Sequence, residues 1–385
     1  MNIIFINCTS NYPYSFSANN SKIGLFAKGI KTTNKDINVT IINTSFGKVP
    51  QEVKDKDFHH KGIRVITYKN YGYKFLMLLR NIFKACNDIA RNKKSKNILI
   101  LCGGYFPIQY LYLIVGKFNG YKIGYIYQEW HRGFKESIIK QINYYMMDTL
   151  FPKASDFVLP ISEFLIEKTK PYNKVYFKLP IIGDFHVPQI SNFRPTEKNY
   201  FVYCASIAYY DVAILIVDAF SKFLENGKED YSLCLVLYGD KIKISQLSSY
   251  INKKNLKSNV IILSSLSDED LFACYCNASA LLIPLNPNII TEKARFSQKI
   301  AEYLSSKCVI ITTAVGEINH YFTNKDNLII SNYSIEGFYL ALKYVSENKQ
   351  KIREIGLRGY EFGKKNFSYK SVADEFLQFL NVTYQ

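Results

Sequence analysis

The stretch from Ala280 to Asn319, ALLIPLNPNIITEKARFSQKIAEYLSSKCVIITTAVGEIN, decides the fold class of this chain. It begins with an apolar run, 280–285, whose length and composition are typical of a buried strand. The segment 294–305 has apolar residues at every fourth position from Phe296, which predicts a helix with one apolar face. A second β-branched run, 309–313, ends in a glycine turn. The stretch therefore predicts a βαβ unit of a parallel sheet.

Charged residues gather in the loops of this unit. In such units, ligands bind at the carboxyl ends of the strands and against the amino ends of the helices. The residues that fall there are Glu292, Lys293, Arg295, Lys299, Glu302 and the Gly316-Glu317 turn. Cations suit phosphate oxygens, and a carboxylate one helical turn further on suits sugar hydroxyls. The pattern predicts a nucleotide-sugar site.

The segment from Phe296 to Glu317 resembles the donor-binding segment of the retaining family-4 glycosyltransferases (glycosyl transferases group 1). The shared features are a Glu-Tyr-Leu triplet that begins at Glu302, a β-branched strand, and a glycine turn followed by a glutamate. The resemblance implies an α/β chain of the GT-B fold. That fold has two Rossmann-like doubly wound domains that face each other across a cleft, and a carboxyl-terminal helix that crosses back to the first domain.

The resemblance also predicts the domain boundaries. An amino-terminal acceptor domain would comprise residues 1–187 together with the helix 368–385, and a donor domain would comprise residues 188–367. Strands are predicted at 2–7, 39–43, 63–67, 98–102, 122–127, 154–160, 200–204, 232–238 and 260–263, with helices between them. This alternation is typical of doubly wound sheets.

Two predicted helices of the first half bear on function. The helix 22–31 follows a polar loop and has Asn20 or Ser21 as its expected cap. The resemblance implies a glycine-rich turn in that loop, where this chain has Ser17-Ala-Asn-Asn20. The helix 73–91 is basic and amphipathic, a pattern that fits either an ordinary crossover helix or a helix that lies on a membrane.

A second group of reactive side chains follows the predicted strand 122–127. Gln128-Glu-Trp-His-Arg-Gly133 contains the only Trp of the chain, and it lies where a doubly wound sheet presents its ligand-binding loops. A lone His is more often structural than catalytic. The resemblance implies that His131 faces the donor sugar. Glu129 is either an acceptor contact or a solvated side chain.

The resemblance assigns further donor contacts, with two departures from the family pattern. Glu302 would bind the ribose hydroxyls, Gly316 and Glu317 would lie near the donor, and Leu266 would pack on the base. The family's Arg and Lys after the first donor-domain strand are missing, so Lys299 and Arg295 are expected to hold the diphosphate, helped by the hydroxyl of Ser206. Glu292 precedes Glu302 by ten residues where the family's first glutamate precedes its second by eight.

The charge of the chain is unevenly distributed. The 385 residues have a formal net charge of +17, and residues 1–193 contain 27 Lys and Arg against 12 Asp and Glu. No RNA-binding or zinc-finger motif is present, which argues against nucleic acid as a partner. An anionic membrane surface and a lysine-rich solvated surface both remain as explanations. Asp55-Lys-Asp57 fits a metal clamp in form, but the flanking lysines favour a solvated loop and no metal is expected.

The sequence thus favours a metal-independent, retaining glycosyltransferase without a cofactor. It would transfer a sugar from a UDP- or GDP-linked donor to a glycan or lipid-linked acceptor of the cell surface. Scattered cysteines indicate a reducing compartment, so a cytoplasmic protein, peripheral on the inner face of the cell membrane, is expected. The alternatives are a non-catalytic GT-B-like binding subunit and a sugar-nucleotide epimerase. The residues do not choose among nucleotides, sugars, acceptors or oligomeric states.

Overall fold

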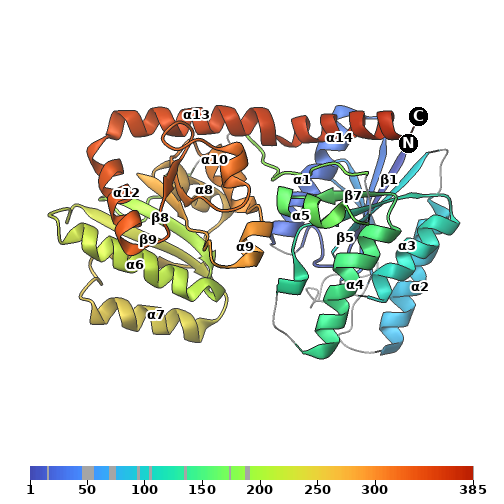
Figure 1. Cartoon of the computed structure of the whole chain (residues 1–385), viewed down its shortest axis with the longest axis horizontal. Helices are drawn as coiled ribbons and strands as arrows, with labels where there is room; N and C mark the ends of the chain where they lie inside the picture. The colour runs from blue at the N-terminus through green and yellow to red at the C-terminus, as the bar shows by residue number, and fades with distance from the viewer. Residues whose placement is uncertain are drawn as a thin grey trace. The chain divides into compact units, whose positions relative to one another are not determined.

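The computed structural model describes residues 1–14, 17–45, 56–68, 75–92, 96–103, 106–133, 137–172, 175–186 and 191–384. The chain forms two compact units (Figure 1). Unit 1 comprises residues 1–183, 293–298 and 366–385, and unit 2 comprises residues 184–292 and 299–365. The predicted boundary between residues 187 and 188 falls outside the described residues and stays a prediction. Each unit is an α/β structure, as the sequence predicts.

Unit 1 is built on a seven-stranded sheet with the order β3-β4-β2-β1-β5-β6-β7. Its strands are β1 (Asn2–Asn7), β2 (Asn38–Asn43), β3 (Lys56–His60), β4 (Ile63–Thr67), β5 (Asn97–Cys102), β6 (Lys122–Tyr127) and β7 (Phe157–Pro160). The pairs are parallel except for β3 and β4, and in the register Phe5 lies between Ile41 and Ile100. Strands β1 and β5 are buried at every position, as a parallel sheet covered on both faces requires.

Helices cover both faces of this sheet. They are α1 (Ala18–Thr33), α2 (Phe75–Arg91), α3 (Ile108–Phe118), α4 (Ile138–Ala154), α5 (Glu163–Thr169) and α14 (Tyr369–Thr383). Helix α1 packs closely on α14, because a Cβ at Gly29 would lie only 2.1 Å from the Tyr369 carbonyl oxygen. Since crossovers are right-handed and α1 runs toward β2 whereas α2, α3 and α4 run toward the β7 edge, the latter three cover the opposite face.

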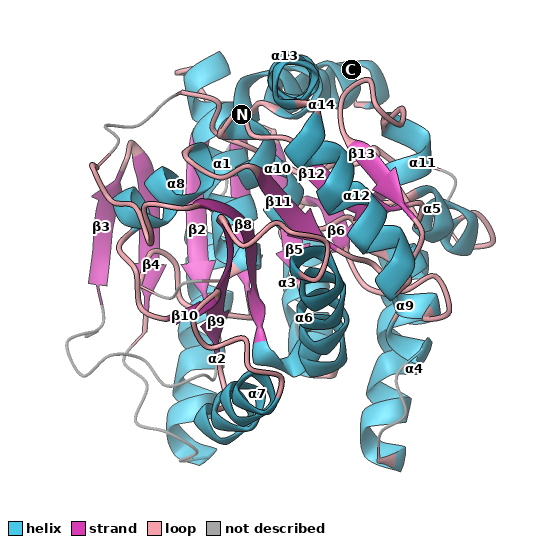
Figure 2. Ribbon diagram, turned by 90° about the vertical axis from the view of Figure 1, so that its left-hand side faces the viewer, coloured by secondary structure: helices cyan, strands magenta, loops and turns pink. Residues whose placement is uncertain are grey.

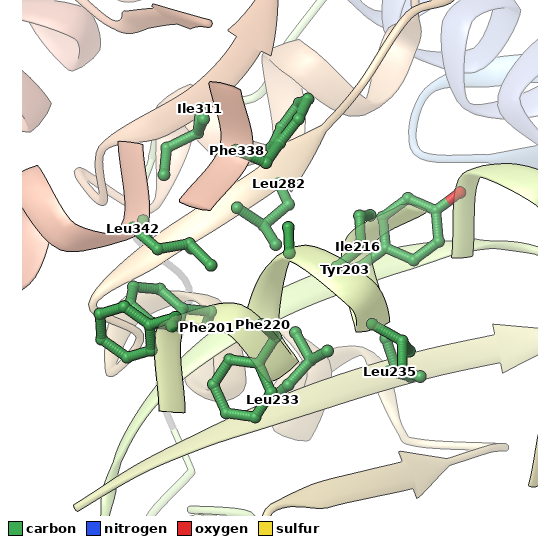
Figure 3. Packing of buried hydrophobic residues seen from close by; sticks show 14 of the residues in the cluster. Phe201, Tyr203, Ile216, Phe220, Leu233, Leu235, Leu282, Ile311, Phe338 and Leu342 are labelled. Atoms are coloured by element: carbon green, nitrogen blue, oxygen red, sulfur yellow. The ribbon is translucent and has the colours of Figure 1, made fainter. Parts of the chain in front are cut away.

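Unit 2 has a six-stranded parallel sheet with the order β10-β9-β8-β11-β12-β13. Its strands are β8 (Asn199–Ser206), β9 (Tyr231–Tyr238), β10 (Val260–Leu263), β11 (Ala280–Ile283), β12 (Ile310–Thr313) and β13 (Ile329–Ser331). Its longer helices are α6 (Tyr210–Leu224), α7 (Lys241–Lys253), α8 (Asp268–Cys276), α12 (Ile335–Glu347) and α13 (Lys349–Phe367). Figure 3 shows Phe201 and Leu233 of the sheet packed against Phe220 of α6, and Phe338 of α12 beside Ile311.

The single helix predicted at 294–305 is wrong, because two short helices occupy this region. They are α9 (Ile290–Ala294) and α10 (Gln298–Ser305). Phe296 lies in the break, where its ring packs 5.6 Å from that of Phe367 within unit 1. The side chain of Gln298 accepts a hydrogen bond from the Ile182 backbone N–H at 3.2 Å. These tertiary contacts override the local helical period.

Two further local predictions are corrected. Residues 56–60 form the edge strand β3 beside β4 (Figure 2) and not a solvated loop, because the Asp57 carboxylate binds the guanidinium of Arg64 on β4 at 2.9 and 2.6 Å. Asp55 lies outside the described residues. Helix α1 begins four residues earlier than expected, with the hydroxyl of Ser17 accepting from the Asn20 N–H at its amino end. Neither Asn20 nor Ser21 is the cap.

Candidate functional site

In unit 2, Lys299 and Glu302 form an ion pair on α10. The Nζ of Lys299 donates to the Oε2 of Glu302 at 2.6 Å, one helical turn away. The side chains are 21% and 36% exposed, so solvent reaches both. Burial is the largest single influence and lowers the pKa of Lys299, but the charge and hydrogen bond of Glu302, together with Cys204 and Tyr238, outweigh it and hold the pKa above its usual value. Lys299 therefore carries a positive charge across the physiological pH range.

The ammonium group of Lys299 lies near an aromatic cluster. Its Nζ lies 6.0 Å from the centroid of the Tyr275 ring, which in turn makes an edge contact with Tyr303 at 5.0 Å. The Tyr303 hydroxyl accepts from the backbone N–H of Cys204 at 3.1 Å and so ties α10 to the end of β8. Burial raises the pKa of Tyr238, and the nearby Lys299 charge opposes this rise. Two buried tyrosines thus connect α10 with the end of β8 beside Lys299.

The other predicted donor contacts within unit 2 lie in strand-end turns. Ser206 ends β8, where its hydroxyl accepts from the Ala208 N–H at 3.3 Å and caps the short helix Ile207–Tyr209. Gly316 has a φ of 55°, a conformation that favours glycine, and it turns the chain from β12 into the buried Glu317. Leu266 is half-buried in the turn between β10 and α8.

Glu292 and Arg295 lie on either side of the boundary between the units. Glu292 is buried in α9, and its charge, after burial and Asp211, raises the pKa of Tyr333. Arg295 belongs to the segment 293–298 of unit 1, whereas Lys299 belongs to unit 2. The joint binding of a diphosphate by Arg295 and Lys299 stays a prediction.

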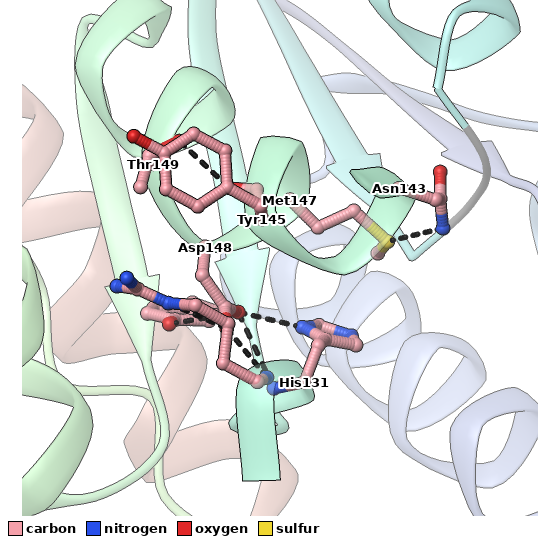
Figure 4. A network of polar contacts seen from close by, with 8 residues as sticks. His131, Asn143, Tyr145, Met147, Asp148 and Thr149 are labelled. Atoms are coloured by element: carbon pink, nitrogen blue, oxygen red, sulfur yellow. Dashed lines mark hydrogen bonds and ion pairs between the residues drawn. The ribbon is translucent and has the colours of Figure 1, made fainter. Parts of the chain in front are cut away.

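In unit 1, a buried carboxylate organises the loop after β6. Asp148 of α4 is fully buried, and its Oδ1 lies 2.8 Å from the Nδ1 of His131 (Figure 4). The same oxygen accepts from the Tyr127 hydroxyl at 3.0 Å, and Oδ2 accepts from the Arg132 backbone N–H at 2.9 Å. An acceptor at Nδ1 places the proton on that nitrogen and leaves Nε2 of the neutral ring as a hydrogen-bond acceptor.

The His131 ring is also fixed by aromatic neighbours. It stacks on Tyr144 at 5.7 Å and lies nearly parallel to Tyr127 at 6.4 Å. Its side chain is 12% exposed, so one edge of the ring reaches the surface. Glu129, in contrast, is exposed and directly precedes the buried Trp130. Asp148 and the aromatic neighbours thus hold the His131 ring in one orientation, with one edge open to a ligand.

Cations stack on Trp130 beside this ring. The guanidinium of Arg132 lies 4.6 Å from the Trp130 ring centroid and 5.5 Å from that of Tyr145. The ammonium group of Lys168 lies 5.1 Å from the same Trp ring. Such contacts fix an otherwise flexible Arg in place. One cation of the loop and one of α5 therefore lie against Trp130, the residue next to His131.

The loop without glycine is held by a network of amide side chains. Buried Asn7 at the end of β1 donates to the side-chain oxygens of Asn20 at 2.9 Å and Asn43 at 3.1 Å. Gln128 donates to the oxygen of Asn19 at 3.0 Å and thereby connects α1 to the His131 loop. The amides of Asn19 and Asn20 are engaged within the protein, so the amino end of α1 presents backbone groups and small side chains.

The sequence singles out His131 as a site candidate but not Asp148 and Tyr127, which the structure places in contact with each other, Asp148 also with His131. Asp148 follows His131 by 17 residues and lies on a different element. One signal was available, because Asp148 is the only acid between Glu136 and Asp156, within a largely apolar predicted helix. A carboxylate at such a position requires a partner. Which partner it takes is decided by the packing of α4 on β6.

Part of the chain matches a known protein family. Residues 189–362 match the family described as Glycosyl transferases group 1. Those residues are a glycosyltransferase domain. The chain is therefore a glycosyltransferase, and the solved structures show that its fold is GT-B. No curated protein sequence matches the chain.

Similar solved structures cover nearly the whole chain. A sucrose-phosphate synthase from Thermosynechococcus elongatus is 14% identical, with a TM-score of 0.74 over 100% of this chain and 99% of that one. Anabaena HepE in complex with UDP and glucose is 13% identical, with a TM-score of 0.71 over 99% and 100%. An α,α-trehalose 6-phosphate synthase from Burkholderia multivorans is 11% identical, with a TM-score of 0.68 over 99% and 98%. At these identities the likeness concerns the fold alone.

The described residues contain neither a metal cluster nor a membrane-spanning helix. Among them, no group of three or more His, Cys, Asp and Glu side chains is arranged to hold a metal ion. No helix in the described part of the chain combines the length and apolar character needed to cross a bilayer.

Proposed function

We propose that this glycosyltransferase moves a sugar from a nucleotide-diphosphate donor to a glycan or lipid-linked acceptor, with retention at the anomeric carbon and without a metal. The observation that carries the proposal is the half-exposed Lys299–Glu302 pair at the carboxyl ends of the unit 2 strands. It provides a fixed positive charge for a diphosphate and, one turn away, a carboxylate for ribose hydroxyls.

Lys299 is the group that would stabilise the departing diphosphate. In a front-face reaction the leaving phosphate takes the proton of the acceptor hydroxyl, so the protein's main task is to stabilise the negative charge that develops. Donor binding would shift the Lys299 ammonium toward the phosphate and free Glu302 for the ribose. Gly316 and Glu317 would contribute backbone amides near the donor, Ser206 a hydroxyl, and Leu266 a surface for the base. Arg295 would assist as a second cation.

A UDP-sugar is the favoured donor, with a GDP-sugar as the second choice. HepE is described in complex with UDP and with UDP-glucose. Its chain and this one share the fold over nearly their full lengths, which supports a UDP-linked sugar here by analogy. The fixed cation of Lys299 would bind phosphate oxygens, and the exposed Tyr238 at the end of β9 could add a hydroxyl group.

His131 would contact the donor sugar through Nε2. The carboxylate of Asp148 keeps the proton on Nδ1, so Nε2 would accept a hydrogen bond from a sugar hydroxyl. Glu129, the exposed second residue of the loop, would contact the acceptor. The acceptor would belong to cell-surface polysaccharide or lipopolysaccharide assembly.

Calorimetric titration with UDP, GDP and CMP tests the donor assignment. Wild type should bind one diphosphate selectively, and Lys299→Ala should weaken that binding by at least about tenfold, since a charge-assisted hydrogen bond contributes roughly 1.5–3 kcal/mol. Lys343→Ala, at an exposed lysine on α12 of the same unit, is the matched control and should bind like wild type.

A non-catalytic binding subunit is the second candidate. The observation that favours it is the engagement of Asn19 and Asn20 in the amide network, together with the missing cation pair after β8. Failure of a well-folded wild type to bind any of the three nucleotides would establish this alternative in place of the enzyme. Binding without sugar transfer to any acceptor would favour it as well.

A further inference from the structure

The helices on one face of unit 1 expose apolar side chains to solvent. On α2, Leu76, Leu79 and Phe83 are exposed at the spacing of one helical face, with Leu76 77% accessible. The opposite side of α2 buries Ala85 and Ile89. Helix α2 is therefore a crossover helix that packs its inner face on the sheet. Its outer face is apolar as well, whereas the outer face of an ordinary solvated helix is polar.

Helix α3 repeats this pattern beside α2. The two helices pack together, and α3 exposes Leu111, Ile114 and Phe118 at the same three-then-four spacing, with Phe118 87% accessible. Scattered single apolar residues are normal on a protein surface. Two regular exposed stripes on neighbouring helices are not, and they indicate a surface that is covered by something else.

Helix α4 adds a projecting end. Its first five residues and the preceding Ser137 are all exposed, and they include Ile138, Ile139 and Ile142. Figure 1 and Figure 2 both show one end of α4 extending beyond the neighbouring strands. This end follows the His131 loop by a few residues, so the projecting isoleucines lie at the same edge of the sheet as His131.

The charge on these three helices is positive. Their cations are Arg80, Lys84, Arg91, Lys117, Lys140 and Lys153, and their only acids are Asp88 and Asp148. Asp148 is buried against His131, and Asp88 accepts a hydrogen bond from the Tyr68 hydroxyl at 2.6 Å. Exposed aliphatic and aromatic side chains among lysines and arginines are the composition of a surface that binds anionic lipid.

We propose that the α2–α3–α4 face of unit 1 docks on an anionic bilayer, with the isoleucines of α4 inserted among the lipid chains. The cations of the face would attract the lipid headgroups, while the apolar stripes would contribute the burial of hydrophobic area. A second copy of the chain is disfavoured as the occupant, because it would set the same six cations against each other. This inference rests on the proposed function, which includes a lipid-linked acceptor. Docking through α4 would bring such an acceptor to the edge of the sheet that carries His131.

Vesicle sedimentation tests the docking directly. Full-length wild type is mixed with vesicles of phosphatidylcholine alone, or of equal parts phosphatidylcholine and phosphatidylglycerol, and should sediment with the second kind only. The double substitution Ile138→Ser/Ile139→Ser should reduce partitioning by at least about tenfold, as the loss of two inserted side chains predicts. The control Leu340→Ser/Leu357→Ser removes two comparably exposed leucines of unit 2 and should partition like wild type.

Three further results separate the explanations. Calorimetric nucleotide binding by the Ile138→Ser/Ile139→Ser protein should equal that of wild type, so a failure of the donor assignment shows itself independently of membrane binding. Equal sedimentation of this variant and wild type would overturn the proposal. A concentration-dependent dimer of wild type that is lost in the variant, without vesicle binding by either, would also overturn it and would assign the face to a second copy.

Discussion

Lys22 of α1 is a buried cation with a backbone carbonyl as its hydrogen-bond acceptor, and its replacement by methionine should stabilise unit 1. The side chain is 5% exposed, and its Nζ donates to the carbonyl oxygen of Leu179 at 3.3 Å. Desolvation by burial lowers the pKa of Lys22 from 10.5 to about 7. The folded protein therefore loses this proton at a lower pH than the unfolded chain does.

The size and sign of the effect follow from this difference in pKa. At 1.36 kcal/mol for each pH unit, the shift corresponds to about 5 kcal/mol of destabilisation below pH 7, where Lys22 is charged in both states. Between about pH 7 and pH 10 the unfolded chain holds a proton that the folded chain lacks, so wild-type stability rises by about 1.4 kcal/mol per pH unit. Lys22→Met abolishes this dependence and loses the bond to Leu179, at a pH-independent cost of about 1 kcal/mol.

Urea unfolding followed by tryptophan fluorescence measures the change in the free energy of unfolding of unit 1. Trp130 is the only tryptophan of the chain and lies in unit 1, as Lys22 does. The free energy of unfolding of Lys22→Met should exceed that of wild type by about 3–4 kcal/mol at pH 7, and the excess should vanish toward pH 10. Lys35→Met, at an exposed lysine, controls for the loss of one charge. A difference between Lys22→Met and wild type that stays constant from pH 7 to pH 10 would refute the reasoning.

Two other substitutions test the remaining structure. Asp148→Asn keeps the size of the side chain but removes the charge that orients His131, so kcat should fall by about 10²-fold with unchanged calorimetric binding of the nucleotide. His131→Ala combined with Asp148→Asn should be no worse than His131→Ala alone, since the two groups act as a unit; an additive loss would contradict this. Gly29→Ala places a Cβ 2.1 Å from the Tyr369 carbonyl oxygen, so it should destabilise unit 1 by about 1–3 kcal/mol in the same urea assay despite the better helix propensity of alanine. Ser21→Ala on the exposed side of α1 is its control, and equal stability of Gly29→Ala and wild type would show that α1 and α14 do not pack closely.

The βαβ alternation could be predicted from the sequence because its signals are local. The apolar runs at β1, β5 and β9 have the length of strands and are buried on both faces, so their composition alone is informative. Lys299 and Glu302 lie at the start of a helix and His131 follows the end of a strand, the places where ligand sites form, and their role in the site stays a prediction. Errors arose where local patterns compete with long-range contacts. Residues 56–60 are too polar to predict as a strand. Their pairing with β4 includes the bond from the Arg64 guanidinium to the Asp57 carboxylate, a contact that local composition does not reveal.

Other features depend on tertiary structure because their partners are distant in the sequence. The break between α9 and α10 reflects contacts of Phe296 with Phe367 and of Gln298 with Ile182, which no periodicity contains. The pairing of His131 with Asp148 requires α4 to pack on β6, and the outer stripe of α2 is distinguishable from its buried stripe only once the sheet lies beneath it. The sequence by itself determined the fold class and the positions of the reactive side chains along the chain. The tertiary structure alone decided which of those side chains meet and which apolar faces stay open to solvent, since burial depends on the three-dimensional neighbours of a residue.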